Sequence, residues 1–271
     1  MTAVWGWTFV LVKDAIAQYP TVSFLAVRFA LAALVMILVV RRWPNRRTWW
    51  VGIPISLALA AGYLLQTVGL QSTSAGNAGL LTGLFVVFTP LLEGVFGVKV
   101  PLRSVAAAVL ALIGTALLTG SGFSLPRFVD LLVIGCALAF AIQLVMLARW
   151  APGLPSGPLA LVQMVISGLV FSVAAAPTIQ VPPRSVWFAL VLTGVLASAI
   201  AFLIQTWALT HLSATRVAVI LATEPAWALV AAVVLAGQRL GPVQGIGAAL
   251  VLLAILGHEA LAMRGGPSPA K

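Results

Sequence analysis

Acidic side chains are scarce in this sequence. The 271 residues include only 5 aspartates and glutamates beside 15 lysines and arginines, and charged residues make up 7% of the chain. A soluble domain usually has about 25% charged residues, which cover its water-facing surface. Hydrophobic residues reach 62% here. This composition excludes an ordinary soluble domain and indicates a protein that lies in a lipid bilayer.

Cysteine and histidine are also rare, which limits the chemistry available to the chain. The one cysteine, Cys136, lies in an apolar run and cannot form an intrachain disulfide. The two histidines, His211 and His258, are not part of a zinc-protease motif. We recognise no nucleophile beside a base and no phosphate-binding loop. We therefore expect no enzyme, no metal site and no cofactor.

The net charge of +10 raises the question of nucleic-acid binding. Such binding needs cations gathered on one accessible face. Here the cations lie between apolar runs, and four of them occupy segment 41–47. This spacing is typical of membrane topology signals. We expect a monomer with no nucleic-acid partner, in contact with the lipid bilayer and a small-molecule substrate.

Apolar runs between proline, glycine and charged breaks predict about ten membrane-spanning helices. Each span needs about 20 mainly apolar residues. The runs cover residues 3–17, 21–40, 49–70, 77–98, 102–119, 128–148, 158–176, 186–209, 215–236 and 243–262. The first run is short for a bilayer core of about 30 Å, and we expect its helix to be truncated at the N-terminus. No connection is long enough to hold a soluble domain.

Loop cations predict the orientation of these spans. Ten lysines and arginines fall in the connections after spans 2, 4, 6 and 8 and in the C-terminal tail, against three in the other connections. Cytoplasmic loops carry the excess of positive charge. We therefore place both termini in the cytoplasm, in the inner (plasma) membrane of a bacterium.

An internal repeat divides the chain into two parts. Segments 66–75 and 205–214 share Gln, Thr, Leu, Ser and Ala at a constant offset of 139. Pro90 and Pro225 follow them, although pairing these prolines requires a four-residue gap.

The repeats are predicted to cover residues 1–120 and 121–271. Five spans is an odd number, so the second repeat should be inverted relative to the first. The predicted fold is an all-α membrane protein of two inverted five-helix repeats. Many secondary transporters are built in this way, although a duplicated scaffold without transport is the alternative.

Several motifs give the chain a family resemblance. Segment 5–14, which opens Trp5-Gly6-Trp7, resembles the start of the EamA family in the drug/metabolite transporter superfamily. Segments 69–78 and 81–90 and the pair Glu224-Pro225 fit the same family. Two features depart from it: the first span starts later than in most members, and Gln238 replaces a usual glutamate.

The resemblance implies a secondary transporter that exports amino acids or related small metabolites by alternating access. It also implies a central cavity lined by spans 1, 3, 4, 6, 8 and 9. A multidrug or toxic-compound exporter of the same fold is the alternative, and a channel or a membrane-embedded enzyme is a more distant one. The sequence identifies neither the substrate nor the energy source.

Ionisable residues within spans are costly, which makes them candidates for function. Arg28 and Glu224 fall near the middle of their spans, where they could bind a substrate carboxylate and a substrate amine or proton. A structural pair between them, or a pair of Arg28 with Asp14 or a backbone carbonyl, is the alternative. Lys13 and Glu93 lie nearer to span ends and could reach the headgroups.

Polar side chains complete the predicted site. Tyr63 and Gln66 are three residues apart and share a helix face, as do Glu224 and Trp227. Glutamines in spans could instead form hydrogen bonds between helices. Pro90 and Pro225 are predicted hinges, with a packing kink as the alternative. The predicted substrate-binding set is Lys13, Arg28, Tyr63, Gln66, Asn77, Gln143, Gln205, Trp207, Glu224 and Trp227.

Overall fold

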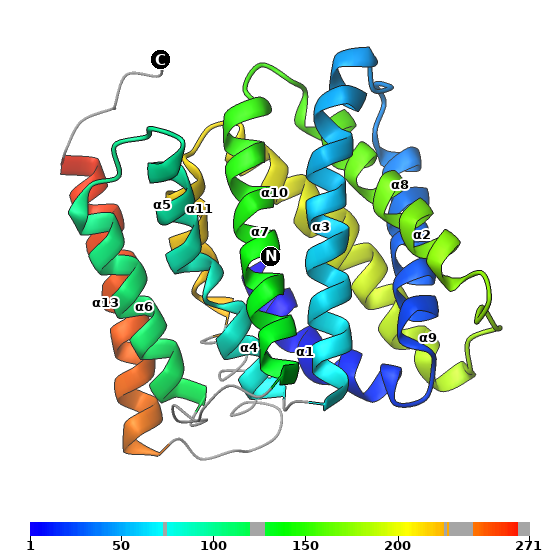
Figure 1. The fold of residues 1–271 in the computed structure, drawn as a ribbon, viewed down its shortest axis with the longest axis horizontal. Helices are drawn as coiled ribbons and strands as arrows, with labels where there is room; N and C mark the ends of the chain where they lie inside the picture. Colours follow the sequence, from blue (N-terminus) through cyan, green and yellow to red (C-terminus); the bar gives the residue numbers. More distant parts are fainter. Residues whose placement is uncertain (73–74, 120–127, 225–226, 228–240, 265–271) are drawn as a thin grey trace.

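Every regular element in the described part of the chain is a helix (Figure 1). The computed structural model describes residues 1–72, 75–119, 128–224, 227 and 241–264. The elements are α1 (Thr2–Ile16), α2 (Thr21–Val39), α3 (Arg46–Ser72), α4 (Ala75–Thr82), α5 (Phe85–Val95), α6 (Leu102–Thr119), α7 (Phe128–Trp150), α8 (Ser156–Ala175), α9 (Arg184–Leu192), the π-helix η1 (Thr193–Ile200), α10 (Ala201–Leu209), α11 (Ala214–Leu221) and α13 (Pro242–Arg264).

Among the described residues, five stretches of helix are long and apolar enough to cross a membrane: α2, α3, residues Leu131–Trp150 of α7, α8, and the run α9–η1–α10. Shorter apolar helices lie at Phe85–Val95, Leu102–Gly114 and Pro242–Ala254. The predicted ranges 21–40 and 102–119 agree closely with α2 and α6. Range 77–98 was predicted as one helix, but it contains α4 and α5 with a turn between them. Range 215–236 is described only as far as 224 and at 227.

The helices are interrupted at the same place in both repeats. α4 and α11 each have eight residues, and their bounds differ by an offset of 139. A two-residue turn follows each helix, and in both turns an amide bonds to the carbonyl three residues earlier: Leu84 N to Leu81 O at 3.2 Å, and Thr223 N to Ile220 O at 3.2 Å. The offset therefore continues without a gap to Glu224.

This register limits how the prolines can align. Carried one residue past Glu224, the offset pairs Pro225 with Val86, so the predicted pairing of Pro225 with Pro90 needs its four-residue gap beyond the described residues. The interruption in the first repeat lies at Gly83 and Leu84, and α5 continues through Pro90 to Val95. The hinge predicted at Pro225 lies outside the described residues.

Corresponding helices of the two repeats run in opposite directions (Figure 1). α3 descends in this view and α9–η1–α10 ascends, while α6 descends and α13 ascends. α2 and α8 are also opposed. The end of the bundle at the top of the view contains the connections after α2, α5, α7 and α10 and the end of α13. These are the connections that the sequence predicted to be cytoplasmic.

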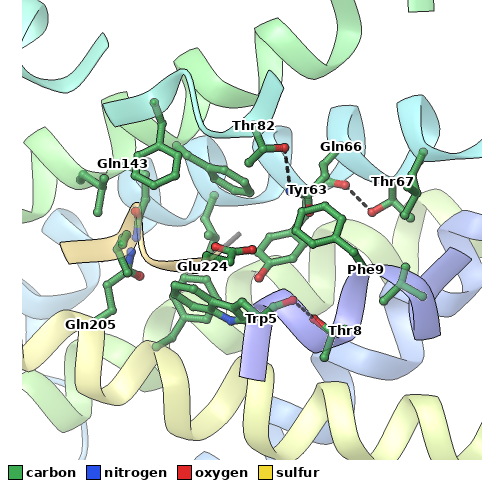
Figure 2. Close-up of a pocket in the computed structure, with 18 of the residues that line it drawn as sticks. Trp5, Thr8, Phe9, Tyr63, Gln66, Thr67, Thr82, Gln143, Gln205 and Glu224 are labelled. Carbon is green, nitrogen blue, oxygen red and sulfur yellow. Dashed lines mark hydrogen bonds between the residues drawn. The ribbon is translucent and has the colours of Figure 1, made fainter. Parts of the chain in front are cut away.

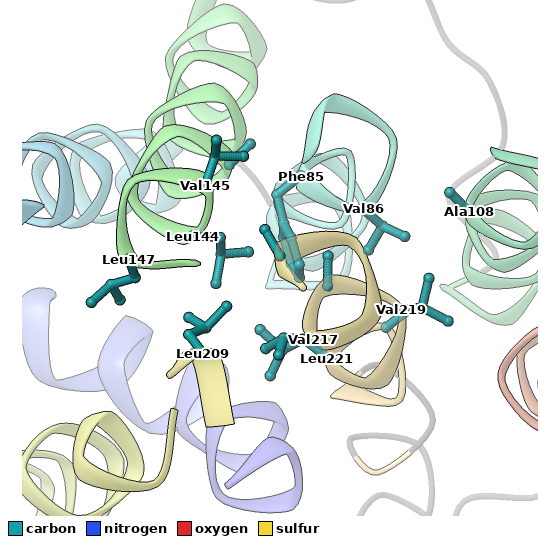
Figure 3. Packing of buried hydrophobic residues seen from close by; sticks show 14 of the residues in the cluster. Phe85, Val86, Ala108, Leu144, Val145, Leu147, Leu209, Val217, Val219 and Leu221 are labelled. Atoms are coloured by element: carbon teal, nitrogen blue, oxygen red, sulfur yellow. The ribbon is translucent and has the colours of Figure 1, made fainter. Parts of the chain in front are cut away.

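The repeats pack into each other along several helix pairs. α2 packs against α8, α3 against α7 and α8, and α6 against α13. One buried cluster joins α5 and α6 to α7, α10 and α11, and its apolar side chains interlock in Figure 3. Each repeat therefore supplies part of the surface that buries the other.

The contact between α6 and α13 depends on a glycine. A Cβ atom at Gly114 would lie 2.8 Å from the carbonyl oxygen of Gly247 and 2.8 Å from the amide nitrogen of Val251. By contrast, a Cβ atom at Gly79 or Gly245 would meet none of the described residues within 4 Å.

A buried carboxylate also links the two repeats. Glu93 of α5 accepts hydrogen bonds from the backbone amides of Ala214 and Thr215, each at 3.2 Å, and from the Thr215 hydroxyl. These amides belong to the first turn of α11, where backbone donors lack helical partners and an anion is favourable. Glu93 therefore caps a helix of the other repeat, and the expectation that it reaches the headgroups was wrong.

Candidate functional site

A cavity lies between helices of both repeats (Figure 2). Its empty volume is about 710 Å³, including any part open to the exterior. The lining residues are Trp5, Thr8, Phe9, Val12, Arg28, Leu59, Tyr63, Gln66, Thr67, Leu70, Thr82, Phe85, Phe140, Gln143, Leu144, Phe202, Gln205, Leu221 and Glu224. Most of them come from α1, α3, α4, α5, α7, α10 and α11. Arg28 comes from α2, and Glu224 follows the two-residue turn after α11.

Arg28 brings a buried positive charge to the cavity. Its side chain is only 3% exposed. Nε donates to Ser198 Oγ at 2.9 Å, and one terminal nitrogen donates to the Tyr63 hydroxyl at 3.3 Å. The guanidinium also lies 4.7 Å from the centre of the Tyr63 ring. Within the described residues Arg28 pairs with no carboxylate, so its structural pairing with Glu224 or Asp14 is not observed.

The π-helix η1 positions the groups around Arg28. Such helices are rare and often lie at functional sites, because the wider turn redirects backbone and side-chain groups. Ser198 of η1 accepts the Arg28 bond, and the carbonyl of Ala197 accepts from the Trp5 indole at 2.6 Å. A Cβ atom at Gly194 would lie 3.0 Å from the Arg28 carbonyl oxygen. Close approach of η1 to α2 thus brings Ser198 within reach of Arg28.

Aromatic rings form much of the wall. Tyr63 packs edge-on against Phe140 at 5.4 Å and Phe202 at 6.0 Å between ring centres. Trp5 lies 5.5 Å from Phe202. Offset and edge-to-face contacts of this kind are favourable for aromatic rings. The wall is therefore stiff and apolar, and the few polar groups set within it are what a ligand can recognise.

Polar groups contributed by the second repeat lie together in Figure 2, where Gln143, Gln205 and Glu224 occupy one side of the cavity. The Gln143 amide nitrogen donates to Gln163 Oε1 at 3.0 Å, and Gln163 donates in turn to the Thr206 hydroxyl at 3.0 Å. Gln205 Oε1 is buried and accepts no hydrogen bond from the residues that the structure describes. Interhelical bonding therefore holds Gln143 and Gln163 but leaves the Gln205 oxygen unsatisfied.

Six of the predicted substrate-binding residues line the cavity: Arg28, Tyr63, Gln66, Gln143, Gln205 and Glu224. Trp207 does not, because it lies two residues from Gln205 on the opposite helix face and is 56% exposed. Trp227 is 46% exposed and lies about one helical turn past Glu224, outside the lining. Lys13 is half-buried and is also outside the lining. Asn77 lies in α4, and its side chain is outside the described part of the chain.

Most of the apolar lining of the cavity was not predicted from the sequence. In the sequence, aromatic residues that line the cavity cannot be distinguished from aromatic residues of the core. This applies to Trp5, Phe9, Phe85, Phe140 and Phe202. The repeat offset could have found some of them, since residues at an offset of 139 recur in the lining. These pairs are Trp5 and Leu144, Tyr63 and Phe202, Gln66 and Gln205, Thr82 and Leu221, and Phe85 and Glu224.

Comparison with known proteins gives consistent matches. The model of the EamA-like transporter family matches residues 1–120 and 127–258. An uncharacterized transporter of Archaeoglobus fulgidus is 31% identical over 258 residues, which cover 93% of this chain and 81% of that protein. The uncharacterized transporter YvbV of Bacillus subtilis is 27% identical over 161 residues, which cover 55% and 52% of the two chains.

A solved crystal structure has a similar fold. It superposes with a TM-score of 0.79 at 21% sequence identity and covers 98% of this chain and 96% of that chain. At this identity the similarity concerns the fold alone. The family model, by contrast, matches both repeats and nearly the whole chain, as the motifs in segments 5–14, 69–78 and 81–90 predicted. The chain belongs to the EamA-like transporter family.

Proposed function

We propose that the protein is a secondary transporter that exports amino acids or related small metabolites across the bacterial inner membrane. The observation that carries this proposal is a buried arginine, Arg28, which faces the cavity and pairs with no carboxylate in the described residues. An uncompensated charge within a membrane is costly. A substrate carboxylate would neutralise it, and Arg is suited to bind carboxylates through two parallel hydrogen bonds.

The proposed mechanism is alternating access. Substrate sites of inverted-repeat transporters lie where the repeats meet, and rocking of one repeat against the other exposes the site to each side in turn. The position of this cavity between helices of both repeats supports that mechanism. The excess of loop cations at one end of the bundle supports cytoplasmic termini. We propose that the protein acts as a monomer.

Counterflow in proteoliposomes tests the proposal. Vesicles that contain the purified full-length chain are loaded with one unlabelled amino acid at a time, and uptake of the labelled compound is measured with and without a pH gradient. We expect accumulation of at least one amino acid above protein-free vesicles. A complete set of amino acids without counterflow would contradict the proposed substrate class, and conductance at channel rates would contradict a carrier.

The aromatic wall favours a second candidate, a multidrug exporter of the same fold. Trp5, Tyr63, Phe140 and Phe202 could hold a flat apolar cation by stacking. The same vesicles loaded with ethidium separate the candidates, since a multidrug exporter would exchange ethidium and an amino-acid exporter would not.

A further inference from the structure

The two repeats place matched positions around the cavity, but the chemistry at these positions differs. At the offset of 139, Gln66 corresponds to Gln205, Thr82 to Leu221, and Phe85 to Glu224, and all six line the cavity. The backbone break between Thr82 and Phe85 recurs between Leu221 and Glu224 with the same hydrogen bond. Differences between these side chains are therefore changes of chemistry at equivalent sites.

The first repeat satisfies its own polar groups at these positions. The Gln66 amide nitrogen donates to the Thr82 hydroxyl at 3.2 Å. Phe85, which follows the break, has no polar group. At these positions of the first repeat, the glutamine amide and the threonine hydroxyl are therefore partners for each other.

The second repeat removes the hydroxyl partner and adds a carboxyl group. Leu221 has no hydroxyl, and Gln205, which is only 4% exposed, keeps a side-chain oxygen with no donor. Nearly all buried polar atoms in proteins have a partner, so this oxygen requires an explanation. Glu224 stands where the first repeat has Phe85, and it forms no ion pair with Arg28. A water molecule could bond to Gln205, but it could not form an ion pair with Glu224.

We propose that Gln205 and Glu224 form a subsite for a protonated amino group, which the asymmetry between the repeats has created. The Glu224 carboxylate supplies the opposite charge, and the Gln205 oxygen accepts one of the ammonium N–H groups. The terminal torsion of glutamine is soft, so the amide can turn its oxygen toward the ligand. Gln143, whose nitrogen is engaged by Gln163, keeps its own oxygen as a further acceptor.

This inference deepens the proposed function and rests on it. Arg28 and the Tyr63 hydroxyl supply donors for a carboxylate, and the subsite supplies acceptors for an amine. One cavity then binds both the carboxylate and the ammonium group of a free amino acid. The apolar rings between them would accept its side chain.

Equilibrium binding to the purified full-length chain in lipid nanodiscs tests the subsite. The probes are alanine, leucine and phenylalanine, each beside its amine-free acid and its carboxyl-free amine. For at least one side chain we expect the amino acid to bind about tenfold more tightly than the amine-free acid.

Glu224→Gln and Gln205→Met should bring the ratio of these two affinities close to one while the affinity for the amine-free acid stays the same. Gln71→Met, a matched change at a glutamine outside the cavity, should keep the ratio. Glu224→Gln is nearly isosteric and decides the test if Gln205→Met does not fold.

The remaining outcomes separate this inference from the proposed function. An unchanged ratio in both variants, or equal weakening of the amino acid and its amine-free acid, would overturn the subsite and leave amino-acid transport standing. Binding of the amines alone, abolished by Glu224→Gln, would support the subsite and contradict an amino-acid substrate. No binding of any probe to the wild-type chain would overturn both.

Discussion

Arg28 shows how a single buried side chain can be held without a counter-ion. Its guanidinium donates hydrogen bonds to a serine hydroxyl and a tyrosine hydroxyl, and it lies over the ring of the same tyrosine. Insertion of an arginine at the bilayer centre costs about 2.5–3.5 kcal/mol, and neutral partners offset only part of that. The residue was identifiable from the sequence because it interrupts an apolar run. Its partners were not, because Ser198 lies 170 residues away in a π-helix that no local pattern predicts.

We predict that Arg28→Lys weakens binding of carboxylate-bearing ligands at least about tenfold, or 1.4 kcal/mol. A lysine ammonium has no planar fork and cannot hold Ser198 and Tyr63 while it also binds a carboxylate through two bonds. The measurement is the dissociation constant of the best-binding amino acid in nanodiscs. Arg42→Lys, at an exposed arginine in the loop after α2, is the control. Equal affinity in the Arg28 variant and the wild type would show that Arg28 has no part in binding.

Leu221→Thr offers Gln205 the hydroxyl that Gln66 has in Thr82. A buried threonine without a partner is less stable than the isosteric valine, because its hydroxyl loses hydrogen bonds to water. We predict that Leu221→Thr is at least as stable as Leu221→Val in detergent. In a Gln205→Met background the threonine variant should become less stable than the valine variant by about 1 kcal/mol. The same difference in both backgrounds would mean that residue 221 does not reach Gln205.

At the scale of helices, the interruption of α4–α5 and its copy after α11 was the feature that the sequence described least well. Prolines are conspicuous in a sequence, but pairing Pro90 with Pro225 requires a four-residue gap, and the register of α4 and α11 contains none. The interruptions themselves lie at Gly83–Leu84 and Ala222–Thr223. Neither pair contains a proline or a charge, and Gly83 is the one residue in them that is typical of turns. Long apolar runs, by contrast, predicted α2 and α6 to within about one residue.

Gly114→Ala should weaken the packing of α6 on α13. The added Cβ would overlap backbone atoms of Gly247 and Val251, which cannot rotate away, and overpacking of this kind costs about 1–3 kcal/mol. The expected result is a lower unfolding temperature in detergent. Gly245→Ala on α13 is the matched control, since its Cβ would meet open space and alanine favours a helix. Equal stability of the Gly114 variant and the wild type would contradict this contact.

Glu93→Ala should destabilise the fold by about 2 kcal/mol, because the first turn of α11 loses a buried side-chain acceptor. Glu93→Gln retains one oxygen and should have a smaller effect. Thermal unfolding in detergent gives the comparison, and Asp14→Ala, at an exposed acidic residue of α1, is the control. If Glu93→Ala unfolds at the same temperature as Asp14→Ala, the cap contributes nothing measurable.

For the whole molecule, composition and apolar runs were enough to predict a helical membrane protein with an internal repeat. The offset of 139 was visible in segments 66–75 and 205–214, and it also relates α4 to α11 in the structure. The cavity was harder to derive, because most of its lining is apolar and looks like core. Gln205 and Trp207 illustrate the limit: they are two residues apart, and only the packed fold shows which of them faces inward.

Topology can be checked by labelling single cysteines in a Cys136→Ala background. Trp43→Cys lies in the connection after α2 and Gln180→Cys in the connection after α8, and both positions are exposed. We predict that a membrane-impermeant maleimide applied from outside intact cells labels the cysteine at 180 and not the cysteine at 43. Labelling of both, or the reverse pattern, would contradict cytoplasmic termini.

α6 packs against α13, which is synthesised only at the end of translation. α2, α3 and α6 enter the membrane before α7, α8 and α13 have been synthesised, so their partner-facing surfaces first lie against lipid. A chain halted near residue 120 would leave the Gly114 surface uncovered and Arg28 without Ser198. The first half of the chain thus lacks part of its packing partners until the last helix is in place.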